Sequence, residues 1–126
     1  EKVTLRIAAR FADEWNVWGD VERLRQKMAI LDGHCAQVGR NPRAIQRSAV
    51  ALLFLTDDRA LVEKMKSRPL ARPAIIGNAD EVREIVRAYR EAGVDELIVP
   101  DFTLGPRDQK LATLERFIRE VASPLR

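Results

Sequence analysis

The feature that most constrains the fold is the run SAVALLFLT at residues 48–56, which is apolar at consecutive positions. A strand with one face in water would alternate apolar and polar residues, so an unbroken apolar run predicts a strand that is covered on both faces. Strands of this kind are typical of parallel sheets that lie between layers of helices. The rest of the chain must therefore supply that cover.

Helical periodicity precedes this strand. Residues 2–12 place Val3, Ile7 and Phe11 at the spacing of one helix face, which predicts a short helix. Residues 13–18 then change to the aromatic and β-branched composition of a short strand. A longer helix is predicted after the N-cap Asp20, and Gly39 ends it. Its apolar stripe repeats every three or four residues, at Val21, Leu24, Met28, Leu31, Cys35 and Val38.

Helices and strands also alternate in the second half. A turn is predicted at Asn41-Pro42, a helix capped by Asp57 or Asp58 runs to about residue 65, and the loop SRPLARP follows. Asn78 and Glu81 have capping-box spacing, which predicts a helix that Gly93 ends before a strand at 96–100. The apolar positions of that helix are Val82, Ile85, Val86 and Tyr89, and those of a final helix are Leu111, Leu114, Phe117, Ile118 and Val121.

This alternation predicts an α/β domain over residues 1–126, with parallel strands and right-handed crossovers. Only three segments make convincing strands: residues 13–18, 48–56 and 96–100. Three parallel strands make a narrow sheet with two open edges, and such edges need cover. We therefore expect the chain to be part of a larger structure.

Composition narrows the class of protein. The chain is 46% hydrophobic, enough for a sizeable core, and its apolar runs are too short to span a bilayer, so we expect a cytoplasmic protein. With one cysteine and one histidine, a Cys/His metal site is not expected. The net charge of +3 lies mostly in residues 59–72, without interleaved aromatic residues. That pattern favours a solvated helix and loop over an anionic partner such as nucleic acid.

Three phrases, in this order and spacing, carry a family resemblance: KVTLRIAARFADEWNVW, HCAQVGRNPRAIQRS and IIGNADEVREIVRAYREAGVDELIVP. Together they resemble the C-terminal part of bacterial luciferase-like monooxygenases, above all the branch that uses the deazaflavin coenzyme F-420. The resemblance implies a TIM (β/α)8 barrel, of which this chain is a C-terminal fragment with about three strands. It also implies that most catalytic groups lie upstream, so we assign no catalytic residue and no metal ligand here.

The resemblance implies a coenzyme site as well, with coenzyme F-420 as the first choice and FMN as the alternative. In the family a glycine-rich turn and the following helix N-terminus hold the coenzyme phosphate, which maps here onto Lys2 and Thr4. A helix N-terminus suits an anion because its first N–H groups are unpaired. Functional residues of a barrel lie at the carboxyl ends of its strands. We therefore expect WNVW, TDD at 56–58 and PDF at 100–102 on one rim.

On that rim, Trp15 and Asn16 are candidates for lining the coenzyme pocket, because an indole stacks on planar rings and an amide bonds ring carbonyls or phosphates. The alternative is packing, since alternation places Trp15 and Val17 on one side of the strand and Asn16 and Trp18 on the other. Asp101 and Phe102 are candidates for substrate binding, with a solvated loop as the alternative.

Other polar groups have structural interpretations. Asp13 and Glu14 are adjacent on a strand and point to opposite faces, so they do not form an acid/base pair. His34 lies beside Cys35 on the apolar stripe of a helix, which indicates packing.

The sequence thus predicts a segment of a flavin- or deazaflavin-dependent oxidoreductase that is inactive alone, acts on a small organic substrate when complete, and forms a homo-oligomer. Two alternatives remain open: a self-associating assembly module and an anion-binding module that uses residues 59–72.

Overall fold

A parallel sheet lies at the centre of the computed structural model, which describes residues 2–126. Its strands are β1 (Glu14–Trp18), β2 (Gln46–Val50) and β5 (Glu96–Ile98), in the order β1-β2-β5. The register pairs Asn16 with Ser48, and Ser48 with Glu96. The predicted α/β class with parallel strands is confirmed.

The apolar run at 48–56 contributes strands to two sheets and not to one. Its first part belongs to β2, and its second part forms β3 (Leu52–Leu55), which pairs in parallel with β4 (Ala74–Gly77). The partner changes at Ala51: the Ala51 N–H donates to the Ile98 carbonyl at 3.2 Å, and the Leu52 N–H donates to the Pro73 carbonyl at 2.9 Å. The prediction of one continuous strand was therefore wrong, and β4 was missed.

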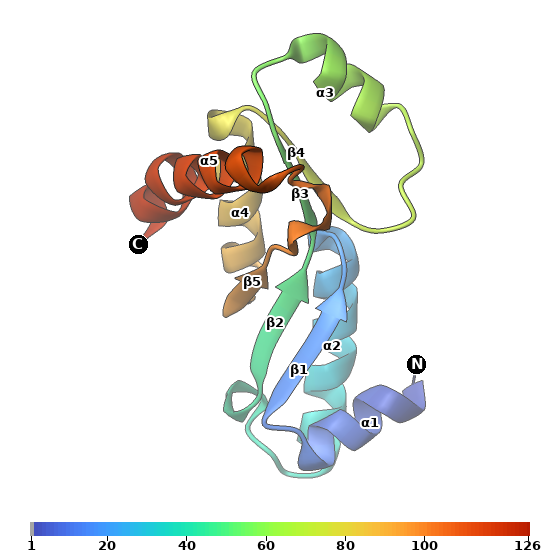
Figure 1. The fold of residues 1–126 in the computed structure, drawn as a ribbon. Helices are drawn as coiled ribbons and strands as arrows, with labels where there is room; N and C mark the ends of the chain where they lie inside the picture. Colours follow the sequence, from blue (N-terminus) through green and yellow to red (C-terminus); the bar gives the residue numbers. More distant parts are fainter. Residues whose placement is uncertain (1) are drawn as a thin grey trace.

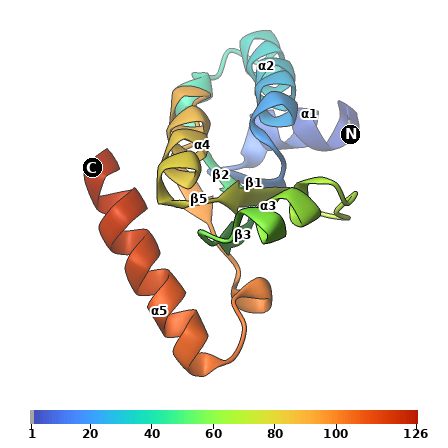
Figure 2. The ribbon, with the colours of Figure 1, turned by 90° about the horizontal axis from the view of Figure 1, so that it is seen from above.

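Three helices cover one side of the central sheet (Figures 1 and 2). They are α1 (Lys2–Phe11), α2 (Val21–Gln37) and α4 (Ala79–Glu91). The side chains of Asp20 and Asn78 cap α2 and α4 by accepting from the backbone N–H groups of Arg23 and Glu81, as predicted. The hydrophobic core lies between these helices and the sheet, and includes Trp15, Leu24, Leu31, Ala49 and Val82.

The remaining elements are one further α-helix after β3, short turns beside β2 and β5, and the C-terminal segment. Asp58 caps α3 (Arg59–Lys66), as predicted. A 3-10 turn, η1 (Pro42–Ala44), precedes β2, and another, η2 (Asp101–Thr103), follows β5. The chain ends in α5 (Arg107–Phe117), a π-helical turn η3 (Ile118–Ala122) and a 3-10 turn η4 (Ser123–Leu125).

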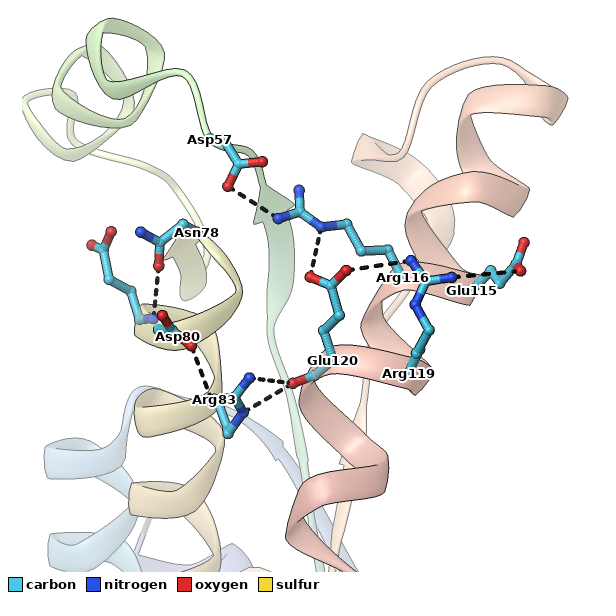
Figure 3. Close-up of polar contacts among 9 residues, drawn as sticks. Asp57, Asn78, Asp80, Arg83, Glu115, Arg116, Arg119 and Glu120 are labelled. Atoms are coloured by element: carbon cyan, nitrogen blue, oxygen red, sulfur yellow. Dashed lines mark hydrogen bonds and ion pairs between the residues drawn. The ribbon is translucent and has the colours of Figure 1, made fainter.

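An ion-pair network holds this C-terminal segment in place (Figure 3). Arg116 donates to Asp57 and to Glu120, each at 3.0 Å. Arg83 of α4 donates twice to the Glu120 backbone carbonyl, at 2.9 and 2.7 Å. The hydrogen bond from Arg116 lowers the pKa of Glu120, which keeps that carboxylate charged. The network therefore ties α5 and η3 both to α4 and to the end of β3.

Helix α1 presents the opposite face from the one its sequence indicates. Its apolar stripe, Val3, Ile7 and Phe11, is 59%, 53% and 75% exposed, whereas Leu5 and Ala9 are buried in the core. The helix was predicted correctly, but the stripe faces solvent in this chain because α1 packs on α2 through its other side.

One buried hydrogen bond joins α4 to the end of β1. The hydroxyl of Tyr89 donates to the Gly19 carbonyl at 2.9 Å. Burial, with a smaller contribution from the charge of Asp20, raises the pKa of Tyr89 from 10.0 to about 12. The neutral phenol is therefore the form that the fold stabilises.

We expect Tyr89→Phe to lower the free energy of unfolding at pH 7 by about 1 kcal/mol, because the Gly19 carbonyl loses its donor. Because folding raises the pKa of Tyr89, the neutral phenol stabilises the folded state fully at pH values below the unfolded-state pKa of 10.0. This stabilisation is lost as the pH rises toward the folded-state pKa of about 12. The difference between wild type and Tyr89→Phe should therefore shrink over that interval. Urea titrations from pH 7 to 12 measure it. A difference that is constant across this range would contradict the assignment.

Candidate functional site

The candidate site is the face of β1 and β2 that points away from the helices. Alternation along β1 places Glu14, Asn16 and Trp18 on this face and Trp15 on the helix side. No helix within residues 2–126 covers this face of β1 and β2 (Figures 1 and 2). We call it the open face, and in register it also carries Ser48 and Glu96.

A directed chain of hydrogen bonds crosses the open face. The Ser48 hydroxyl donates to Glu14 Oε1 at 2.7 Å, and Asn16 Nδ2 donates to Ser48 Oγ at 2.8 Å. An ionised carboxylate only accepts, so the serine proton points to Glu14 and the serine lone pair takes the Asn16 N–H. Ser48 is 1% exposed, the one fully buried polar side chain among the described residues.

These hydrogen bonds fix the orientation of the Asn16 side-chain amide. With Nδ2 directed at Ser48, the carbonyl Oδ1 has no hydrogen-bond partner within residues 2–126, and the second Nδ2 proton is also available. An amide with one free acceptor and one free donor complements the imide edge of a planar heterocycle, which carries an N–H beside a C=O. Glu14 and Glu96 add two carboxylates to the same face. The described residues hold no group of three or more metal-ligating side chains.

The two tryptophans lie on different sides of the sheet. Trp15 is 8% exposed and packs in the core, so its ring is not on the open face. Trp18 is half-buried at the carboxyl end of β1, and the Arg72 guanidinium lies 4.4 Å from its ring centroid. Trp18 is therefore the tryptophan beside the site. The alternation of β1 already placed it on the same side as Asn16, but no sequence pattern indicated the contact with Arg72.

The other predicted site residues take no part in the hydrogen-bond chain of Glu14, Ser48 and Asn16. Lys2 and Thr4 are exposed in the first turn of α1, which packs on α2 and not on the open face. Asp101 and Phe102 form part of η2, on the side of the strands opposite α2 and α4 (Figure 2). Lys110 lowers the pKa of Asp101 through a 2.5 Å hydrogen bond, and Phe102 is 72% exposed. The structure thus joins Asn16 to Glu14 and Ser48, and it leaves Lys2 and Thr4 apart from them.

One of the three expected rim segments is out of place. Trp18, Val50 and Ile98 are level in register at the carboxyl ends of the central strands. Residues 56–58 lie beyond β3, because the chain continues from β2 into a second sheet before it reaches them. There Asp58 caps α3 and Asp57 binds Arg116. The prediction that TDD shares the rim with WNVW was wrong.

The structural interpretation of the remaining polar groups holds. Cys35 is completely buried on α2 and belongs to the core. His34 contacts Gln37 on the same helix, with 3.4 Å between Nδ1 and Oε1. These two residues form no nucleophile and base pair.

Solved structures share this fold. The chain superposes on the coenzyme F-420-dependent tetrahydromethanopterin reductase of Methanopyrus kandleri with a TM-score of 0.75, at 14% identity over 100% of this chain and 49% of that one. It matches the long-chain alkane monooxygenase LadA with a TM-score of 0.69, at 17% identity over 96% of this chain and 38% of that one.

A third solved structure is the monooxygenase RslO1 of Streptomyces bottropensis, with a TM-score of 0.70 at 16% identity, covering 99% of this chain and 46% of that one. No protein-family model and no curated protein matches the chain. The sequence resemblance is thus confirmed at the level of the fold, which is that of part of a luciferase-like barrel. The chain spans less than half the length of each of these structures.

Between residues 2 and 126, none of the helices has the length and hydropathy of a membrane-spanning segment.

Proposed function

We propose that this chain is the C-terminal part of a luciferase-like barrel oxidoreductase, and that its open face is one wall of the coenzyme pocket. The observation that carries this proposal is the hydrogen-bond chain from Glu14 through Ser48 to Asn16. A polar network on a sheet face without helix cover suits the interior of a barrel at a ligand, whereas a face that only packed against protein would be apolar.

The residues present fit a flavin or a deazaflavin. Both coenzymes have a planar ring system with an imide edge, and the fixed Asn16 amide offers the complementary acceptor and donor. Coenzyme F-420 is the first choice and FMN the alternative, in line with structural neighbours that include a coenzyme F-420-dependent secondary alcohol dehydrogenase and a riboflavin lyase with modified FMN. When bound, the coenzyme supplies hydride transfer or, for FMN, oxygen activation.

The residues of this chain position the coenzyme, and they take no part in the chemical step. Asn16 orients the ring edge, Ser48 and Glu14 hold Asn16, and Trp18 closes the carboxyl end of the same face. Lys2 and Thr4 at the start of α1 remain candidates for the coenzyme phosphate, and Asp101 and Phe102 for a small organic substrate. The catalytic groups would lie upstream, so we expect the isolated chain, a single domain over residues 1–126, to be inactive and cytoplasmic.

Titration of coenzyme F-420 and of FMN into the isolated chain and into the complete barrel protein tests this proposal. We expect the complete protein to bind one of them and the isolated chain to bind neither measurably. Asn16→Leu should weaken binding by about tenfold, the value of one hydrogen bond in a desolvated site. Ser48→Ala should weaken it less, because Asn16 remains but can rotate.

The matched control is Gln26→Leu, which removes an exposed amide from α2 on the other side of the sheet. Its affinity should equal that of the unchanged protein. The proposal fails if the complete protein binds neither coenzyme, or if Asn16→Leu and Gln26→Leu bind equally well.

The exposed stripe of α1 supports a second candidate function, a self-associating module. Val3, Ile7 and Phe11 are exposed on one stripe of α1. The same helix carries Lys2, Arg6 and Arg10 and no acidic residue. Covering such a patch favours association, which also agrees with the expected homo-oligomer.

Light scattering on a size-exclusion column measures this association. We expect the chain to form a dimer or larger assembly, and Phe11→Ser to shift it toward the monomer because the most exposed member of the stripe becomes polar. A monomer at every protein concentration would exclude the assembly function.

A further inference from the structure

A second pocket lies at the carboxyl end of β1, where the loop between α3 and β4 folds against the start of α2. Its lining combines one aromatic ring, one carboxylate and two guanidinium groups with the apolar part of the loop: Trp18, Asp20, Arg23, Leu70, Ala71, Arg72 and Pro73. Neither the open-face network nor the ion-pair network of Figure 3 includes these side chains.

Arg72 is held in a way that leaves its hydrogen-bonding edge unused. Its planar guanidinium lies over the Trp18 ring in a cation–π contact, with Cζ 4.4 Å from the ring centroid. The five N–H donors point outward from the edge of that plane. Within residues 2–126, Arg72 forms no ion pair and no hydrogen bond. Stacking therefore fixes the position of a cation whose donors remain available.

Arg23 adds a second cation at an unfavourable place. It lies in the first turn of α2, where the helix dipole disfavours positive charge. Its backbone N–H donates to Asp20 Oδ1 at 2.8 Å, which commits that carboxylate to the cap, and the nearby Glu22 accepts from Gln26. The guanidinium of Arg23 forms no ion pair in the described part of the chain.

Some arginines of this chain are neutralised by carboxylates, and others have no ion pair within residues 2–126. Ion pairs to Asp or Glu are made by Arg40, Arg47, Arg59, Arg83, Arg87, Arg116 and Arg119. Two guanidinium groups that line one pocket and lack such a partner therefore leave a local surplus of positive charge, even with Asp20 counted against them.

We propose that this pocket binds the phosphate or carboxylate group of a small molecule. The planar fork of a guanidinium matches both anions through two parallel N–H···O bonds, and Trp18 holds Arg72 in place before the anion arrives. Arg23 lines the same pocket and supplies the second charge. Only Trp18 is shared with the proposed coenzyme wall, and neither Arg23 nor Arg72 takes part in that proposal, so the anion site can be tested separately.

Tryptophan fluorescence tests the proposal directly, since Trp18 lines the pocket whereas the other tryptophan, Trp15, is buried in the core. Inorganic phosphate and citrate are titrated in the millimolar range at constant ionic strength, with sodium chloride as the reference salt. We expect a saturable change in emission with phosphate, citrate or both, and none with chloride. Phosphate alone or citrate alone then identifies the preferred group.

Variants separate the site from general charge attraction. Arg72→Gln and Arg23→Gln should each weaken binding by about tenfold through loss of a charge-assisted hydrogen bond, and Arg72→Lys should restore part of the affinity. Arg25→Gln is the matched control, because Arg25 is exposed on the same helix and does not line the pocket.

The absence of saturation, or an equal loss of affinity in Arg25→Gln and Arg72→Gln, would overturn the proposal. Circular dichroism checks that each variant is folded. If Arg72→Gln does not fold, the comparison of Arg23→Gln with Arg25→Gln decides the matter alone.

Discussion

The structure depends on one constraint: the buried backbone of the apolar run must find a hydrogen-bond partner for every N–H and C=O group. Residues 48–51 and Leu53 are buried, and an unpaired buried amide is costly. Two strands, β1 and β5, flank the first half of the run, and β4 pairs with the second half. The change of partner at Ala51 sets where each sheet ends and therefore where the loops beyond them lie.

The need to satisfy buried polar groups also distinguishes the two faces of the central sheet. The helix side is closed by α1, α2 and α4 and filled with apolar side chains such as Trp15 and Ala49. The open face carries Glu14, Asn16 and Ser48, whose polar atoms satisfy one another. A buried hydroxyl without partners would destabilise the sheet, so the network makes Ser48 compatible with the fold and at the same time fixes the amide of Asn16.

The features that local side-chain chemistry determines were predictable from the sequence. The caps at Asp20, Asp58 and Asn78 and the stripe of α2 follow from side-chain chemistry within a few residues, and the structure has them. Strand β4 was missed, because AIIG is short and becomes a strand only through pairing with β3. There was also no means to know which face of α1 would be buried, since both faces carry apolar side chains.

The candidate site was also predicted only in part. Asn16 was proposed from its place near the carboxyl end of a strand and from the family resemblance, and alternation separated it from Trp15. Its partners Ser48 and Glu14 were not identified, because Ser48 lies on another strand and only the register brings it opposite Asn16. The stacking of Arg72 on Trp18 was missed for the same reason, since a loop from a distant part of the sequence supplies the guanidinium.

The central claim is that the open face forms the coenzyme wall of a complete barrel, with Asn16 as the contact. A crystal structure of the complete protein with bound coenzyme F-420 or FMN tests it most directly, through the distance from Asn16 Oδ1 to the nearest ring nitrogen. The account predicts a hydrogen bond of about 3 Å, with the Asn16 amide still donating to Ser48. A coenzyme ring bound away from β1, or an Asn16 amide turned from it, would contradict the account.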